Sequence, residues 1–280
     1  MLDAVPEPPD PRELLKKHGL FAKKSFGQNF LRDYRVHARI AAALGVKTGD
    51  VVVELGAGLG TLTWYLAHTK ATVHAVERDR DLAPILREVM RPFANVTIHE
   101  ADAKKVDYAS FGARVAVAGN IPYQLTSPII FALFEQREVA ERVALLVQKE
   151  VADRIVEPPG SKTYGLLSVL LGAIATVERV CVVPAGAFHP APRVDSAVIS
   201  WRVKPGVEGV DARFVAIVKA AFQQRRKTLR NALRAYGDPL LDALRAEGVE
   251  AERRAETVSP ETFLAAARRY SRENSSGANS

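Results

Sequence analysis

Three glycines at alternate positions, Gly56, Gly58 and Gly60, follow an apolar run at residues 51–55. Glu54 lies two residues before the first of them. Glycines at the end of a strand let a ligand approach the backbone closely. The third glycine comes one residue earlier than in the G-x-G-x-x-G spacing of dinucleotide sites. The pattern therefore favours S-adenosylmethionine over a nicotinamide cofactor, with Glu54 ordering the turn or reaching the ammonium group of that cofactor.

Two further acidic residues follow apolar runs. Glu77 ends the run at residues 72–77, where an acid can accept hydrogen bonds from both hydroxyls of a ribose. Asp102 follows the run at residues 96–100 and could accept from the adenine amino group of the cofactor, or it could be an ordinary loop cap. The order of these acids after the glycine turn strengthens the prediction of a nucleoside-containing cofactor.

The tetrapeptide Asn120-Ile121-Pro122-Tyr123 follows a fourth apolar run. An exocyclic adenine amine is a poor nucleophile because its lone pair is delocalised into the ring. The Asn120 side-chain oxygen and the backbone carbonyl of Ile121 or Pro122 could accept from such an amine and orient it, while Tyr123 stacks on the base. No strong base is needed, because the methylated amine is acidic enough to lose its proton to water. These four residues are candidate catalytic residues.

The elements that must position these residues alternate along the chain. Short β-branched runs at residues 51–55, 72–77, 96–100, 115–119 and 143–148 are separated by helical patterns that start near residues 61, 81, 126 and 150. This alternation predicts an α/β fold with a parallel sheet covered on both faces. A helical run at 164–175 precedes two apolar strands, 179–183 and 196–203, which we expect to form an antiparallel hairpin. A parallel sheet that ends in an antiparallel hairpin is the plan of the Rossmann-like class I methyltransferases.

The pattern becomes helical after residues 204–209, with helices expected at 211–223, 227–235, 238–246 and 260–271. We therefore expect four segments: a partly disordered N-terminal extension at 1–23, a methyltransferase domain at 24–204, a small all-helical C-terminal RNA-binding domain at 205–272, and a disordered tail at 273–280. No run is apolar and long enough to span a membrane, so the cytoplasm is the expected location. The single cysteine, Cys181, cannot form an internal disulfide, and no metal site is expected.

The charge of the chain is concentrated at its two ends. The net charge is +7. Residues 12–39 hold eight Lys or Arg against two acids, and residues 201–280 hold fifteen against ten, whereas the middle is close to neutral. Such segregation suits a neutral catalytic body flanked by surfaces that bind a polyanion, although solvated helix faces would give the same composition. The candidate RNA-binding residues are Lys23, Lys24, Arg225, Arg226, Lys227, Arg230 and Arg234. On one helix, residues 226, 230 and 234 would form a basic stripe.

Seven sequence blocks, in order, resemble the KsgA-type (RsmA) ribosomal RNA adenine dimethyltransferases. That family shares its catalytic domain with the Erm macrolide-resistance methyltransferases and the mitochondrial transcription factor B proteins. The blocks are SFGQNFL (25–31), VVELGAGLGTLT (52–63), AVERD (75–79), AGNIPYQLTSPII (118–130), LLVQKEVADRI (145–155), FHPAPRVDSAV (188–198) and FQQRRKTLRNAL (222–233). The resemblance implies dimethylation at N6 of two adjacent adenines in the 3'-terminal helix loop of 16S rRNA, on a pre-assembled small subunit or its precursor, by a monomeric enzyme.

The resemblance also implies roles for individual residues. Gln28, Asn29 and Leu31 would line the cofactor entrance. Gly56, Glu77, Asp102 and Asn120 would hold the methyl donor. Tyr123 and Phe188 would enclose the target adenine between their rings; from the residues alone, Phe188 could equally cover the edge of the sheet.

Several alternatives remain open. A ribosome-assembly or RNA-binding factor with secondary catalysis would keep the same fold, but the complete NIPY and glycine motifs argue against loss of catalysis. An Erm-like enzyme would methylate 23S rRNA instead, and FQQRRKTLRNAL with the helical C-terminal region favours the KsgA type. The glycine spacing disfavours a nicotinamide oxidoreductase, and a DNA adenine methyltransferase fits the seven blocks less well.

Overall fold

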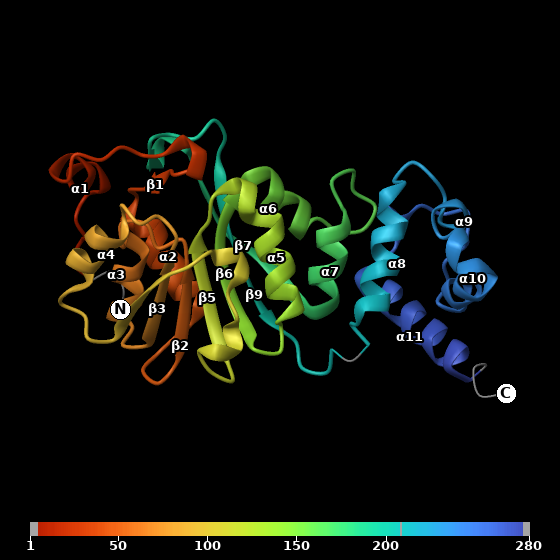
Figure 1. Cartoon of the computed structure of the whole chain (residues 1–280). Coiled ribbons are helices and arrows are strands. Elements are labelled where there is room, and N and C mark those ends of the chain that lie inside the picture. Colours follow the sequence, from red (N-terminus) through yellow and green to blue (C-terminus); the bar gives the residue numbers. More distant parts are fainter. Residues whose placement is uncertain (1–4, 208, 277–280) are drawn as a thin grey trace. The chain divides into compact units, whose positions relative to one another are not determined.

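A computed structural model describes residues 5–207 and 209–276 (Figure 1). Of the residues predicted to be disordered, 1–4 and 277–280 lie outside the described residues. Residues 273–276, also predicted to belong to the disordered tail, form the end of a helix that runs from Pro260 to Ser276. Internal contacts divide the chain into two units: Met1–Ala152 with Glu178–Val203, and Asp153–Val177 with Lys204–Ser280. Residues 153–177 thus group with the C-terminal helices, whereas the sequence pattern predicts a boundary at residue 204.

A seven-stranded sheet runs through the first unit in the order β4-β3-β2-β5-β6-β9-β7. The strands are β2 (Val51–Leu55), β3 (Thr72–Glu77), β4 (Val96–Glu100), β5 (Val115–Asn120), β6 (Ala140–Gln148), β7 (Ala175–Val183) and β9 (Ser196–Val203). Strands β4, β3, β2, β5 and β6 are parallel, and β9 is antiparallel to β6. The predicted parallel sheet with an antiparallel end is confirmed.

The strand order reverses at β2, which lies between β3 and β5. Because β2, β3 and β5 are parallel, their carboxyl ends lie at the same edge of the sheet. Leu55, the last residue of β2, pairs with Val76 of β3 and with Gly119 of β5. Ligands bind at such a reversal point in α/β sheets, and the glycine turn, Glu77 and Asn120 all follow these three strands.

Helices α1 (Pro11–Lys17), α2 (Tyr34–Leu44), α3 (Thr61–His68) and α4 (Ala83–Met90) pack on one face of the sheet. Val52 and Val73 pack with α2 and α3 in one cluster, and Ala75 packs with α1 and α4 in another. Val73 and Ala75 lie two residues apart on β3 and therefore point to the same face. Val53 and Leu55, on the opposite face of β2, are fully buried as well, so both faces are covered. The chain also forms α5 (Thr126–Glu135) after β5 and α6 (Lys149–Val156) after β6.

Helices α1 and α2 are absent from the sequence prediction, although each carries ordinary boundary signals. Asp33 caps α2 by accepting from the Arg35 amide, and Gly45 ends the helix in a left-handed conformation with φ of 59°. Asp10 caps α1, with Pro11 as its first residue.

The second unit is helical. It contains α7 (Leu166–Ile174), α8 (Ala212–Gln223), α9 (Leu229–Ala232), α10 (Gly237–Ala246) and α11 (Pro260–Ser276). Helices α7, α8 and α11 pack against one another, and α10 packs on α11. Gly172 allows the close approach of α7 to α11, because a Cβ there would lie 2.6 Å from the Pro260 Cγ atom. Within residues 5–207 and 209–276, no helix is long and apolar enough to cross a membrane.

The helix expected at residues 227–235 is much shorter in the structure. Helix α9 begins at Leu229 because the amides of Leu229 and Arg230 donate to the carbonyls of Arg253 and Ala251, at 2.8 and 2.9 Å. Residues 224–228 form a turn, and a 3-10 turn follows at Arg234–Tyr236. The expectation of a regular basic stripe formed by residues 226, 230 and 234 on one helix is therefore wrong.

Candidate functional site

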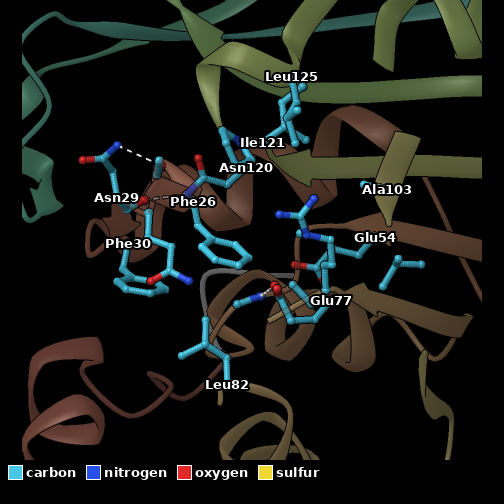
Figure 2. Close-up of a pocket in the computed structure, with 18 of the residues that line it drawn as sticks. Phe26, Asn29, Phe30, Glu54, Glu77, Leu82, Ala103, Asn120, Ile121 and Leu125 are labelled. Atoms are coloured by element: carbon cyan, nitrogen blue, oxygen red, sulfur yellow. Dashed lines mark hydrogen bonds between the residues drawn. The ribbon is translucent and has the colours of Figure 1, made fainter. Parts of the chain in front are cut away.

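A cavity of about 240 Å³ lies at the carboxyl edge of β2, β3 and β5 (Figure 2). Twelve of the fourteen residues predicted from the sequence to bind cofactor or catalyse line it, together with other residues. The predicted residues that line it are Gln28, Asn29, Leu31, Glu54, Gly56, Gly58, Glu77, Asp102, Asn120, Ile121, Pro122 and Tyr123. Gly60 and Phe188 do not belong to the lining.

The glycine turn folds as the ligand-binding prediction requires at its first two positions. Gly56 and Gly58 have φ values of 72° and 57°, which residues with a side chain rarely adopt. A Cβ on Gly56 would lie 3.8 Å from the Asn120 carbonyl oxygen, so the turn and the end of β5 are close neighbours. Gly60 differs, because a Cβ there would lie 2.8 Å from the Leu86 Cδ1 atom of α4. Gly60 permits helix packing behind the turn.

Glu77 organises the turn from the neighbouring strand. Its Oε2 atom accepts from the Gly58 amide at 2.8 Å, and its Oε1 atom accepts from the Asp79 amide at 2.7 Å. Burial raises the pKa of the Glu77 carboxyl, although these backbone donors oppose the shift. The carboxyl thus already holds the loop against which a cofactor ribose would lie.

Two buried polar atoms at the pocket have no hydrogen-bond partner among the described residues, Glu54 Oε2 and His37 Nδ1. Burial raises the pKa of Glu54 to about 8, against the opposing effect of Thr63, and burial lowers the pKa of His37 to about 3. Buried polar atoms without partners are uncommon in folded proteins. The amino-acid end of S-adenosylmethionine carries both donors and acceptors, so the lining fits this cofactor.

Asp102 is a loop cap that also lines the pocket, and acceptance from the adenine amino group of the cofactor stays a prediction. It caps a 3-10 turn by accepting from the Lys104 amide at 3.0 Å, and it also lines the pocket. The Arg78 guanidinium lies 3.5 Å from its carboxylate. Burial opposes ionisation of Asp102, but the Lys104 amide and the positive charges of the Lys104 and Arg78 side chains together lower its pKa. The residue is therefore an anionic acceptor at the pocket wall.

The NIPY segment turns away from the end of β5. The Asn120 amide donates from Nδ2 to the Asn29 carbonyl oxygen at 3.2 Å, which leaves the Oδ1 atom as the acceptor on that side chain (Figure 2). Tyr123 begins a 3-10 turn, and its hydroxyl shares a hydrogen bond of 2.7 Å with Ser196 Oγ. The NIPY segment therefore brings an amide oxygen and an aromatic ring to the same cavity.

Phe188 lies beside the pocket wall rather than in it. It belongs to β8 (Phe188–His189), which pairs antiparallel with β1 (Phe30–Leu31) so that Leu31 faces Phe188 in register. The side chain is 4% exposed and packs in the cluster under α2. A role in stacking on the target base stays a prediction that requires the ring to turn outward.

The predicted RNA-binding residues divide into engaged and exposed groups. Lys23 contacts Asp79 and Asp81 at 2.5 and 2.6 Å, Arg225 donates to the carbonyls of Lys162 and Tyr164, and Arg230 pairs with Glu252. Arg225 and Arg230 are exposed although they make these contacts, and the exposed residues outside these contacts are Lys24, Arg226, Lys227 and Arg234. Contact with RNA stays a prediction for all seven, and the last four are the better placed for it.

Sequence reasoning missed two residues in and beside this pocket, Phe26 and Asp79. Phe26 lines the pocket, with the cationic groups of Lys23 and Arg78 over its ring at 5.2 and 4.8 Å from the centroid. Asp79 accepts hydrogen bonds from Lys23 and Gln28, which lie 56 and 51 positions earlier in the chain. No local pattern marks contacts at such separations, although Asp79 does stand in the AVERD block.

Comparisons with known proteins agree with this geometry. The family model for ribosomal RNA adenine dimethylase matches residues 19–272. A Myxococcus xanthus protein named ribosomal RNA small subunit methyltransferase A is 48% identical over 91% of this chain and 93% of its own. A Geobacter metallireducens protein of the same name is 41% identical over 91% and 97%.

Solved structures extend the comparison to the fold. The 23S rRNA methyltransferase ErmE has a TM-score of 0.69 at 29% identity, over 87% of this chain and 100% of that one. A Plasmodium falciparum dimethyladenosine transferase has a TM-score of 0.77 at 23% identity, over 88% and 98%. Both show the same fold as this chain, a class I methyltransferase sheet with a helical C-terminal region.

Proposed function

The chain belongs to the ribosomal RNA adenine dimethylase family, and we propose that it dimethylates N6 of two adjacent adenines in the 3'-terminal helix loop of 16S rRNA. It is an S-adenosylmethionine-dependent rRNA adenine methyltransferase. The observation that carries the choice of acceptor is the position of Asn120, whose Oδ1 oxygen is left as an acceptor beside the glycine turn. An amide oxygen there can accept a hydrogen bond from an amine, and the family match indicates that the amine belongs to an adenine.

The residues of the pocket divide into two groups in this proposal. Glu77, Asp102 and the glycine turn bind the cofactor, which supplies a methyl group on a sulfonium. Asn120 Oδ1 and a backbone carbonyl of the NIPY segment accept hydrogen bonds from the N6 amine and so orient its lone pair. The acceptors also stabilise the positive charge that the nitrogen gains, until water takes the proton.

Tyr123 holds the base in this proposal. Its hydroxyl is fixed by Ser196 at 2.7 Å, so the ring has a defined orientation at the pocket. Stacking on an aromatic ring contributes about 1–3 kcal/mol per base. Tyr123 therefore selects for an adenine that has left its helix or loop stack.

We further propose that the substrate is the small ribosomal subunit or its precursor, and that a monomer acts on it in the cytoplasm. Relatives named as small subunit methyltransferases support the choice of subunit. The exposed basic residues of the second unit supply contacts for an RNA backbone, which favours a folded particle over a short RNA.

The experiment is methyl transfer from labelled S-adenosylmethionine to three substrates: naked 16S rRNA, unmethylated small subunits and large-subunit precursors. Nucleoside analysis identifies the product. We expect the wild-type protein to form dimethyladenosine on the small-subunit particle. The Asn120→Ala variant should form none. Label in large-subunit RNA would overturn the choice of subunit. Salt-sensitive binding to particles without transfer would favour an assembly factor instead.

A further inference from the structure

Asp79 is a buried carboxylate that no role assigned above requires. It follows β3, and the residue is 3% exposed. Its Oδ1 atom accepts from the Lys23 ammonium at 2.5 Å, and its Oδ2 atom accepts from the Gln28 amide at 2.7 Å. The Asp81 amide donates to it as well, at 3.1 Å. A buried charge is costly unless it is paired in this way.

The two side chains that Asp79 holds belong to one segment, residues 23–31, called here the N-terminal strap. Residues 25–31 of the strap form one wall of the cofactor pocket. Gln28 also accepts from the Lys23 amide at 2.8 Å, which fixes this end of the strap as a unit. Phe26 lies between these two residues in the chain, and its ring contributes to the pocket wall.

The other end of the strap is held separately. Strand β1 pairs with β8 there, and the next residue, Arg32, donates its amide to the Ala187 carbonyl at 2.8 Å. Between the two ends, the Asn29 carbonyl accepts from Asn120 at the longer distance of 3.2 Å. Asp79 is thus the buried polar attachment of the end of the strap that carries Phe26, and the exposed Asp81 also contacts Lys23 there, at 2.6 Å.

Asp79 also contacts the cofactor glutamate through its backbone. The Asp79 amide donates to Glu77 Oε1 at 2.7 Å, and Glu77 in turn accepts from Gly58. Because the amide belongs to the backbone, a side-chain substitution at Asp79 leaves this bond available. The contact to the strap and the placement of Glu77 can therefore be separated experimentally.

We propose that Asp79 is a positioning residue that fastens the N-terminal strap against the end of β3 and thereby sets how long the cofactor stays bound. The inference rests on the proposed function, since it names what controls residence in the same pocket. Loss of the carboxylate charge weakens the bonds to Lys23 and Gln28, and Lys23 keeps only its partly exposed ion pair with Asp81, so the wall that carries Phe26 can move away from the pocket. Glu77 and Asn120 stay in place, so the chemical step is spared.

The test measures S-adenosylmethionine binding and dissociation without RNA, using Asp79→Asn, Lys23→Met and the double variant. Hydrogen bonds to charged groups are strong enough to predict dissociation about 10-fold faster in Asp79→Asn. The effect of the double variant should be smaller than the sum of the two single effects, because both changes break the Lys23–Asp79 contact, while Lys23→Met also breaks the ion pair with Asp81. With saturating cofactor and RNA, the turnover of Asp79→Asn should stay within about 2-fold of wild type while its KM for the cofactor rises about 10-fold.

The matched control is the pair Lys17 and Glu88, which joins α1 to α4 at the same 2.5 Å distance outside the pocket. Lys17→Met and Glu88→Gln should leave cofactor dissociation unchanged. If Asp79→Asn does not fold, Gln28→Leu removes the other side chain that binds Asp79, and it should also speed dissociation of the cofactor.

Three outcomes would overturn the proposal. The first is cofactor dissociation at the wild-type rate in both Asp79→Asn and Gln28→Leu. The second is strictly additive effects in the double variant. The third is a fall in the turnover of Asp79→Asn that is fully explained by a smaller fraction of folded protein, which marks a merely structural residue. A wild-type protein that binds no S-adenosylmethionine would instead refute the proposed function, so the two failures are distinguishable.

Discussion

Glu77 Oε2 accepts a hydrogen bond of 2.8 Å from the backbone amide of Gly58, which joins the end of β3 to the glycine turn that follows β2. The register of the sheet makes this contact possible, because Leu55 pairs with Val76 one residue before Glu77. One carboxyl group therefore shapes the cofactor loop and lines the cofactor pocket.

Glu77→Gln should weaken S-adenosylmethionine binding by about 10- to 100-fold. The amide has a single oxygen for the two backbone donors of Gly58 and Asp79, and a buried donor left without an acceptor costs about 1–3 kcal/mol. Isothermal titration calorimetry measures the change. Glu100, the register partner of Glu77 on β4, is the matched control, since it lies outside the pocket lining. Equal effects of Glu77→Gln and Glu100→Gln would contradict this explanation.

Tyr123→Ala should lower single-turnover methylation by about 10- to 100-fold, because stacking on a base contributes about 1–3 kcal/mol. Tyr123→Phe keeps the ring and loses only the 2.7 Å bond to Ser196, so we expect less than about a 5-fold loss. Quench-flow with bound cofactor and excess particle measures both. A Phe variant as impaired as the Ala variant would show that the hydroxyl, and not the ring, is what the reaction needs.

The parts of the fold that were predictable from the sequence are those with strong local patterns. The runs of β-branched residues in β2, β3 and β4 match the observed bounds. In β2 the cause is burial on both faces, which needs a nearly continuous apolar sequence, whereas β4 is an edge strand that is only partly buried. Strand β6 begins three residues earlier than predicted, at Ala140, because the polar residues Glu141 and Arg142 interrupt the apolar run. Arg142 is accommodated in the sheet by an ion pair of 3.2 Å with Asp50.

The candidate site was only partly predictable, for a different reason. Residues that follow a strand, such as Glu77 and Asn120, could be assigned from the order of elements alone. The roles of Asp79 and Phe26 depend on a segment far away in the chain that folds across the pocket, and the burial of Phe188 depends on the pairing of β1 with β8. Strands of two residues carry no period that a sequence could reveal.

Glu54→Gln should remove a pH dependence of stability between about pH 6.5 and 8. The pKa of Glu54 is raised from 4.5 to about 8 by burial, so across this interval the folded protein binds more protons than the unfolded chain. The contribution of Glu54 is fully present below pH 4.5 and is lost as pH rises to 8. The slope approaches about 1.4 kcal/mol per pH unit. Urea unfolding followed by tryptophan fluorescence measures it.

The interval is chosen to avoid His37. Its pKa is lowered from 6.5 to about 3 by burial, so its contribution makes stability rise with pH up to about 6.5 and is constant above. A cofactor ammonium beside Glu54 would favour the carboxylate, so saturating S-adenosylmethionine should flatten the slope. An unchanged slope in Glu54→Gln would show that other groups titrate in this range.

Arg226→Gln and Arg225→Gln should affect different properties. Arg226 is exposed, so its loss should weaken RNA binding and reduce the salt dependence by about one counterion. Arg225 donates to the carbonyls of Lys162 and Tyr164, so its loss should cost about 1 kcal/mol of stability with little change in the salt slope. Filter binding to small-subunit particles across a salt series, with thermal unfolding in parallel, distinguishes the two. A shared change in salt slope would place both at the RNA.

Phe188→Leu should clearly slow methyl transfer while it lowers the free energy of unfolding only a little. The substitution keeps most of the buried volume of a side chain that is 4% exposed, so the stability loss should stay below about 1.5 kcal/mol. If the ring turns outward to stack on the target base, the loss of its π-face should slow transfer by about 10-fold or more. Phe134→Leu on α5 is the control, because Phe134 is also buried, at 3% exposure, in the same unit. Equal rates in the two variants at saturating substrate would assign Phe188 to the core, leaving Tyr123 as the aromatic residue that holds the base.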